Sequence, residues 1–123
     1  MVKKRIAYTE NVLTATIAES GNLSTVINKS GYKNMLIIMP SAWTTADITF
    51  AVSSTKSGTF SKLTYGTDGS EVTVKAVAST VIALDGKVKE VLEACPFVKI
   101  RSGTAGNPVS QAAARTLTIV LME

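Results

Sequence analysis

The chain has 123 residues, of which 46% are hydrophobic and only 18% are charged, below the roughly 25% charge that is typical of soluble domains. It contains no histidine and a single cysteine, which excludes an internal disulfide, a Cys/His zinc cluster and a nucleophile activated by a histidine base. A chain of this length is typical of one domain with its own core.

The net charge of +4 is concentrated at the start of the chain, where Lys3, Lys4 and Arg5 are adjacent. The remainder is close to neutral, so we expect no broad basic surface and no nucleic-acid partner. No segment approaches about 18 consecutive apolar residues, and the start is too polar for a signal peptide. We therefore expect a soluble, unprocessed protein without a membrane partner, with a flexible basic arm at 1–10 and a single domain at 11–123.

The first half of the chain predicts a series of short strands. Residues 11–18 alternate apolar and polar side chains, which is the period of a half-buried strand. A second short candidate lies at 23–27. The continuous apolar run at 35–39 predicts a central strand that is covered on both faces. Residues 47–53 alternate cleanly, and a Ser-Gly-Thr-Phe turn after them predicts a hairpin with 60–65.

The second half predicts further strands and one helix. Short apolar segments at 72–74 and 81–84 are each preceded or followed by an Asp-Gly turn. Apolar residues at helical spacing predict a short helix at 87–95, ended by the proline that follows it. The last two strands are expected at 97–101 and 115–121.

These elements together indicate an all-β protein. Seven to nine short strands, frequent turn signals and one short helix are typical of an antiparallel β-sandwich or a small barrel. No linker or repeat divides the chain.

The glycine-rich stretch after Arg101 raises the question of an anion-binding loop. A phosphate loop needs a Gly-Lys-Ser/Thr ending, whereas here the second glycine is followed by Asn107 and by a proline that has no amide to donate. We interpret the stretch as a connection in which Thr104, Asn107 and Gln111 satisfy exposed backbone groups.

No other constellation predicts chemistry. The Asp-Gly-Ser-Glu sequence lacks the twelve-residue ligand spacing of a calcium loop, so we expect no metal. Cys95 lies in an apolar neighbourhood and is expected to be a buried, unreactive thiol. Trp43, the one tryptophan, is interpreted as a lid on the core or an interface anchor, with stacking on a sugar ring as the alternative.

Two stretches together resemble a known group of proteins. They are P-S-A-W-T-T-A-D-I-T-F-A-V-S, which is followed by an S-G-T-F turn, and F-V-K-I-R-S-G-T-A-G-N-P-V-S-Q-A-A-A-R-T-L-T-I-V-L. Across residues 35–121 the chain resembles small tailed-phage virion proteins of the head decoration or auxiliary type. Both stretches also look like pieces of a discoidin-like jelly roll. The resemblance implies a β-sandwich and a virion role, and it carries over no catalytic residue and no cofactor.

The resemblance leads to the hypothesis of a structural protein rather than an enzyme. We expect a capsid decoration or cement protein that binds and stabilises the major capsid protein lattice, forms a homotrimer, lies on the capsid surface of the virion and is assembled in the host cytoplasm. One alternative is a carbohydrate-binding module that binds surface glycans through Trp43, Asn107 and Gln111. Another is a structural protein of the tail or neck.

The expected contact residues come from the basic arm, the tryptophan loop and the glycine-rich connection. They are Lys3, Lys4, Arg5, Trp43, Arg101, Thr104, Asn107, Gln111 and Arg115.

Overall fold

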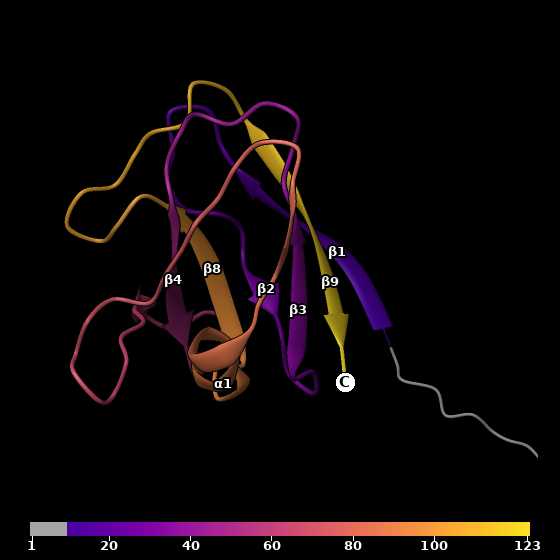
Figure 1. Cartoon of the computed structure of the whole chain (residues 1–123), viewed down its shortest axis with the longest axis vertical. Helices are drawn as coiled ribbons and strands as arrows, with labels where there is room; N and C mark the ends of the chain where they lie inside the picture. The colour runs from indigo at the N-terminus through magenta and orange to yellow at the C-terminus, as the bar shows by residue number, and fades with distance from the viewer. Residues whose placement is uncertain (1–9) are drawn as a thin grey trace, which may run out of the picture.

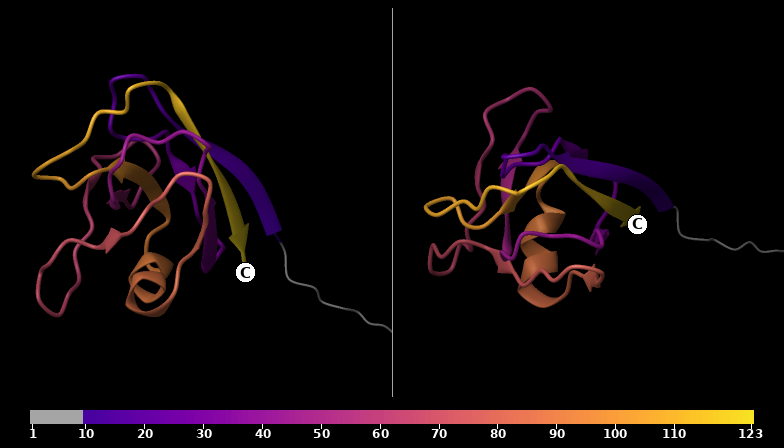
Figure 2. Two further views of the ribbon diagram at one scale, coloured as in Figure 1. Left: turned by 45° about the horizontal axis from the view of Figure 1, so that its top comes forward. Right: turned by 90° about the horizontal axis from the view of Figure 1, so that it is seen from above.

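Two antiparallel sheets face each other across one hydrophobic core in the computed structural model, which describes residues 10–123 (Figure 1). The first sheet has the strand order β1-β9-β3-β7. Its strands are β1 (Glu10–Ile17), β9 (Arg115–Met122), β3 (Asn34–Ile38) and β7 (Val81–Ala83). Figure 2 shows β1 at the margin of this sheet with β9 as its neighbour.

The second sheet has the order β2-β8-β4-β5, and β6 also pairs with β4. Its strands are β2 (Ile27–Asn28), β8 (Phe97–Ser102), β4 (Ile48–Ser53), β5 (Ser61–Lys62) and β6 (Thr73–Val74). The helix α1 (Gly86–Glu93) lies at one end of the sandwich, and the connections β3–β4 and β8–β9 lie at the other (Figure 1).

The core follows from the two-residue period of the strands. Alternate side chains of β1, β3 and β9 point toward the second sheet, and those of β2, β4 and β8 point back toward them. The most deeply buried are Ala15, Ile17, Ile27, Ile37, Ile48, Phe50, Val98, Ile100, Leu117, Ile119 and Leu121, all 0% exposed. Leu92 of α1 closes the core at the helix end.

Most of the expected elements are present at the expected places. The strands expected at 11–18, 97–101 and 115–121 are β1, β8 and β9, and the helix expected at 87–95 is α1. The expected hairpin is formed by β4 and β5. Residues 1–9, which include most of the expected basic arm, lie outside the described residues, and Glu10 already belongs to β1.

The expectation that the apolar run at 35–39 is covered on both faces was wrong. The run at 35–39 forms β3, but only one of its faces is buried: Ile37 is fully buried while Ile38 on the opposite face is 37% exposed. Conversely, β4 is covered on both faces, because Thr49 and Ala51 on its outer side are 0% and 1% exposed. Side chains and a loop from distant parts of the sequence cover this outer side.

The strand expected at 23–27 is reduced to its last residue, which begins β2. Here a side-chain hydrogen bond to a distant residue replaces part of a regular ladder. Ser24 donates its amide N–H to the carbonyl of Ile100 at 2.8 Å, and its Oγ accepts the amide N–H of the same residue at 2.9 Å. A serine side chain that bonds to backbone groups in this way competes with strand pairing.

Candidate functional site

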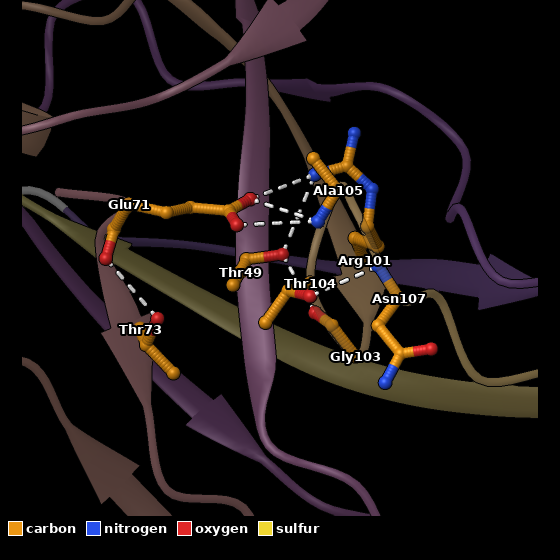
Figure 3. A network of polar contacts seen from close by, with 8 residues as sticks. All are labelled: Thr49, Glu71, Thr73, Arg101, Gly103, Thr104, Ala105 and Asn107. Carbon is orange, nitrogen blue, oxygen red and sulfur yellow. Dashed lines mark hydrogen bonds and ion pairs between the residues drawn. The ribbon is translucent and has the colours of Figure 1, made fainter.

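The end of the sandwich opposite α1 is organised by an ion pair between Arg101 of β8 and Glu71. Nη1 of Arg101 lies 3.2 Å from Oε2 of Glu71, and the two side chains are 10% and 15% exposed. The same Nη1 lies 3.4 Å from the Oγ1 of Thr49, which faces Arg101 across the β4–β8 ladder (Figure 3). The pair therefore covers the outer side of β4 and buries Thr49.

Glu71 also fixes the loop that follows β8. Both of its carboxylate oxygens accept the amide N–H of Ala105, at 3.2 and 3.1 Å. Thr49 donates its hydroxyl to the carbonyl of Gly103 at 2.7 Å, and Gly103 donates its amide N–H to the carbonyl of Asp47 at 2.8 Å. Figure 3 shows the contacts that Glu71 and Thr49 make with this loop. The Glu71 carboxylate and the hydrogen bonds of Thr49 and Asp47 therefore fix the base of the loop.

Gly103 is required for this turn. Its φ is +86°, a value that L side chains rarely adopt, and a Cβ atom there would lie 2.7 Å from the Asn107 carbonyl oxygen and the Val109 amide nitrogen. Within the loop, Thr104 Oγ1 accepts the Asn107 amide N–H at 3.1 Å. Gly106, Asn107 and Pro108 are exposed, and the Asn107 amide points away from Glu71 (Figure 3). The loop thus presents an ordered, polar tip.

A second cluster, around Gln111, joins the β8–β9 connection to the β3–β4 connection. Gln111 is 0% exposed. Its Oε1 accepts the amide N–H of Thr44 at 2.8 Å, and its Nε2 donates to the carbonyl of Thr44 at 3.0 Å and to the Oγ of Ser102 at 2.7 Å. Gln111 therefore satisfies backbone groups, as expected, but they belong to the distant β3–β4 connection and the side chain is buried, which the sequence interpretation did not predict.

Arg115 and Trp43 lie beside this cluster and are half-buried. Arg115 donates through Nε to the Oε1 of Gln111 at 3.0 Å and through Nη2 to the Oγ1 of Thr44 at 3.2 Å. Trp43 packs against the core and donates its Nε1–H to the carbonyl of Ala46 at 3.0 Å. The tryptophan acts as a lid whose polar atom is already paired within the chain.

The structure thus gathers the expected contact residues into two neighbouring groups. Arg101 lies at the base of the ordered loop that carries Thr104 and Asn107, and Trp43 and Arg115 lie beside Gln111. Lys3, Lys4 and Arg5 lie outside the described residues. A role in contacts with another molecule stays a prediction for all of them, and within this chain Arg101 and Gln111 are buried. Sequence reasoning did not select Glu71 for this site, because nothing in the sequence joins it to Arg101.

The outer face of the first sheet has a different character. Its side chains come from alternate positions of β1, β9, β3 and β7 that share one side of the sheet. We call this surface the uncharged face; it consists of Val12, Thr14, Thr16, Asn34, Leu36, Ile38, Val81, Ala83, Thr116, Thr118, Val120 and Met122. None of these side chains is charged, and Val12, Ile38 and Val81 are 58%, 37% and 60% exposed. One charged residue, Glu10, stands at the border of the face, as the first residue of β1 and opposite Met122 in the register.

The outer face of the second sheet is charged. Lys62 of β5 and Lys99 of β8 lie on either side of Ala51 in the strand register. The Nζ of Lys99 lies 4.7 Å from the centre of the Phe60 ring, a cation–π contact that holds the lysine stem against the sheet. Together with Arg101 these side chains cover β4.

Near α1, Lys29 and Cys95 are both buried, at 2% and 8% exposure. Burial lowers the pKa of the Lys29 ammonium below its usual 10.5, and Cys95 and Glu93 act in the opposite direction. The Nζ of Lys29 donates to the carbonyl of Tyr32 at 3.1 Å. Burial also raises the pKa of the Cys95 thiol above 9.0, which fits the expectation of an unreactive cysteine.

The hollows of the described surface are small. One of them, with a volume of about 280 Å³, lies between β6, β7 and α1, with Lys75 and Asp85 among its lining residues. Within residues 10–123, no group of three or more cysteine or acidic side chains is arranged to bind a metal ion. No helix in the same range is long and apolar enough to cross a membrane.

Comparison with known proteins finds a solved structure with a similar fold. No protein-family model matches the chain, and no curated protein matches its sequence significantly. The fold is similar to that of the crystal structure of the SPBc2 prophage-derived protein YomS, with a TM-score of 0.62 over 99% of this chain and 100% of that chain. The two sequences are 13% identical. This likeness and the two antiparallel sheets confirm the expected all-β sandwich.

Proposed function

We propose that the chain is a structural protein of a tailed-phage particle and, more specifically, a capsid decoration protein that docks on the major capsid lattice. The observation that carries the proposal is the uncharged face. Soluble monomers rarely leave a broad apolar surface in water, and such a surface marks an interaction site. Here a four-stranded sheet presents valine, isoleucine, leucine and threonine outward with no charge among them.

The composition of this face suits repeated docking on a large shell. Threonine and valine side chains are short, so little side-chain entropy is lost when they are covered. Each contact can be weak, because many copies bound to one lattice add to the stability of the whole particle. The hollow between β6, β7 and α1, about 280 Å³, lies at the lower limit of ligand pockets, so it gives little support to a small-molecule site.

The ordered loop after β8 gives the proposed surface a second element. Glu71, Thr49 and Asp47 hold its base, and Asn107 lies at its exposed tip. A loop that is already ordered loses less entropy when a partner binds it. We assign this tip a secondary contact with a neighbouring protein of the particle.

A phage origin is part of the proposal, and two facts support it. The fold is similar to that of a prophage-derived protein, and the sequence motifs around Trp43 and Arg101 resemble those of small tailed-phage virion proteins. Fold similarity alone does not determine function, so the capsid role depends on the character of the uncharged face.

Co-sedimentation with expanded capsids of the encoding phage tests the proposal. Full-length protein should bind, and Ile38→Lys, which places a charge in the middle of the uncharged face, should reduce the bound fraction at least about tenfold. Thr73→Lys is the matched control, because it adds the same charge to an exposed position on the opposite sheet; it should bind normally. Absence of binding by the wild type, or equal binding by Ile38→Lys, would overturn the proposal.

A further inference from the structure

We propose that β1 pairs along its open edge with β1 of a second copy of this chain, in antiparallel orientation across a twofold axis. The pairing would join two first sheets into one continuous sheet and two uncharged faces into one surface. The inference stands on the geometry of β1 and does not require the capsid role.

The backbone of β1 has an unpaired side. β1 is the outermost strand of its sheet, with β9 as its neighbour on the inner side. Thr16 shows which groups point outward: its carbonyl accepts the amide N–H of Thr25 at 3.0 Å, and its own amide N–H donates to the Oγ1 of Thr25 at 3.1 Å. Backbone direction alternates along an antiparallel strand. The N–H and C=O groups of Val12 and Thr14 therefore point the same way, where no strand or bridge among residues 10–123 meets them.

This edge has few of the features that usually prevent strand pairing, since Glu10 at its start is the one charged residue of β1. Proteins protect open edges with charged side chains, prolines, bulges or very short strands. β1 is 8 residues long, and its register with β9 is unbroken from Glu10 to Ile17. Residues 11–18 contain no charge and no proline. The edge is therefore a ready template for another strand.

The position of Thr25 fixes where the second strand can lie. Thr25 already occupies the outward groups of Thr16, so the overlap must be centred nearer the start of β1. An antiparallel arrangement with Val12 opposite Val12 of the second copy satisfies this condition. In this arrangement the two Val12 residues form a hydrogen-bonded pair, and Thr14 of each copy lies opposite Glu10 of the other copy. The two Val12 side chains, each 58% exposed in the single chain, meet across the axis.

Charge favours a second copy as the occupant. With Val12 opposite Val12, Glu10 lies opposite the uncharged Thr14 of the second copy, so two identical strands bring no like charges directly opposite each other. The apolar row Val12, Val120, Leu36 and Ala83 would continue across the axis into the same row of the second copy. An isologous contact of this kind closes with two subunits. It differs from the homotrimer that the sequence resemblance implies, and that trimer is the competing outcome.

The test combines the mass in solution with two matched pairs of variants. Full-length wild type should sediment as a concentration-dependent dimer. Val12→Lys should weaken the dimer at least about tenfold, because it places like charges directly opposite each other. Val81→Lys is the control, since Val81 has nearly the same exposure, 60%, on the opposite edge of the same sheet. It should leave the dimer unchanged.

A cross-link provides a positive signal that does not depend on weakening the contact. Cα atoms of a hydrogen-bonded antiparallel pair lie about 5.5 Å apart, within the range of a disulfide. Val12→Cys should therefore form a disulfide-linked dimer under mild oxidation, and Val81→Cys should not. A wild type that is monomeric at all concentrations, a trimer weakened equally by both lysine variants, or equal cross-linking of both cysteine variants would overturn the inference.

Discussion

On the outer face of the second sheet Thr49 and Ala51 are almost fully buried, whereas Ile38 and Val81 on the outer face of the first sheet are exposed. The second sheet is covered from within the chain by long charged side chains, including the Arg101–Glu71 pair. The side chains of the uncharged face carry no charge and are mostly short, and several of them stay exposed. One outer face is therefore covered by the chain itself, whereas the other is open to solvent, which is the basis of the proposed docking role.

The largest effect is expected from breaking the covered face. Glu71→Ala leaves the Arg101 guanidinium and the Ala105 amide without their shared acceptor, so it should lower the free energy of unfolding by about 3 kcal/mol, measured by urea denaturation. Arg101→Met combined with Glu71→Met should cost clearly less, because no buried charge is left unpaired. If the double variant were less stable than Glu71→Ala, the pair would not be what holds this face.

A smaller loss is expected at Gln111. Gln111→Ala removes the groups that satisfy both backbone atoms of Thr44, so it should cost about 2 kcal/mol in the free energy of unfolding, measured by urea denaturation. Ala113→Ser is a control, since this exposed residue lies in the same connection and should change stability by less than about 0.5 kcal/mol. Equal stability of the two variants would contradict the role given to Gln111.

Lys29 provides a pH-dependent prediction near the edge of the core. Burial lowers the pKa of Lys29 in the folded protein below 10.5, its ordinary value in the unfolded chain. At a pH between the folded and the unfolded pKa, the unfolded chain binds more protons than the folded protein. The contribution of Lys29 to stability therefore rises with pH in that window. Lys29→Met should therefore be more stable than the wild type at pH 7, with an advantage that narrows as pH approaches 10.5. Thermal denaturation of both proteins between pH 7 and pH 10.5 measures this difference in stability. A difference that widens as the pH rises would contradict the prediction.

The smallest change in stability is expected on the uncharged face. Ile38→Lys adds a charge at a position that is already in contact with water, so the free energy of unfolding should change by less than about 0.5 kcal/mol. The measurement is urea denaturation beside the capsid-binding assay. A loss comparable to that of Glu71→Ala would mean that Ile38 serves the fold rather than an interface.

Local sequence pattern was sufficient for much of the fold. The alternation in β1, β4 and β9 and the helical spacing in α1 are properties of neighbouring residues, and these elements lie where the pattern predicts them. The apolar run of β3 led to a wrong prediction that both of its faces are covered, and the alternation in β4 did not show that its outer side is buried. Coverage depends on residues brought in from elsewhere: Arg101 lies 30 positions from Glu71 and 52 from Thr49.

The candidate site also has features that the sequence predicts and features that it does not. The bond from Thr104 to the Asn107 amide could be predicted, because short polar residues in a connection usually bond to nearby backbone groups. That Gln111 bonds to backbone groups could be predicted too, but its partner, Thr44, could not, since it lies 67 positions away. Glu71 could not be selected, since its partners are set by the meeting of two distant loops. The uncharged face was also not predicted as a surface, because it exists only once β1, β9, β3 and β7 are placed in register.

Hydroxyl-radical footprinting of the full-length protein, free and bound to expanded capsids, tests most directly which face meets the partner. The account predicts that modification of Ile38 and Val120 falls on binding, while modification of Phe60 and Phe97 on the charged sheet does not change. Protection of Phe60 and Phe97 with unchanged modification of Ile38 and Val120 would contradict it.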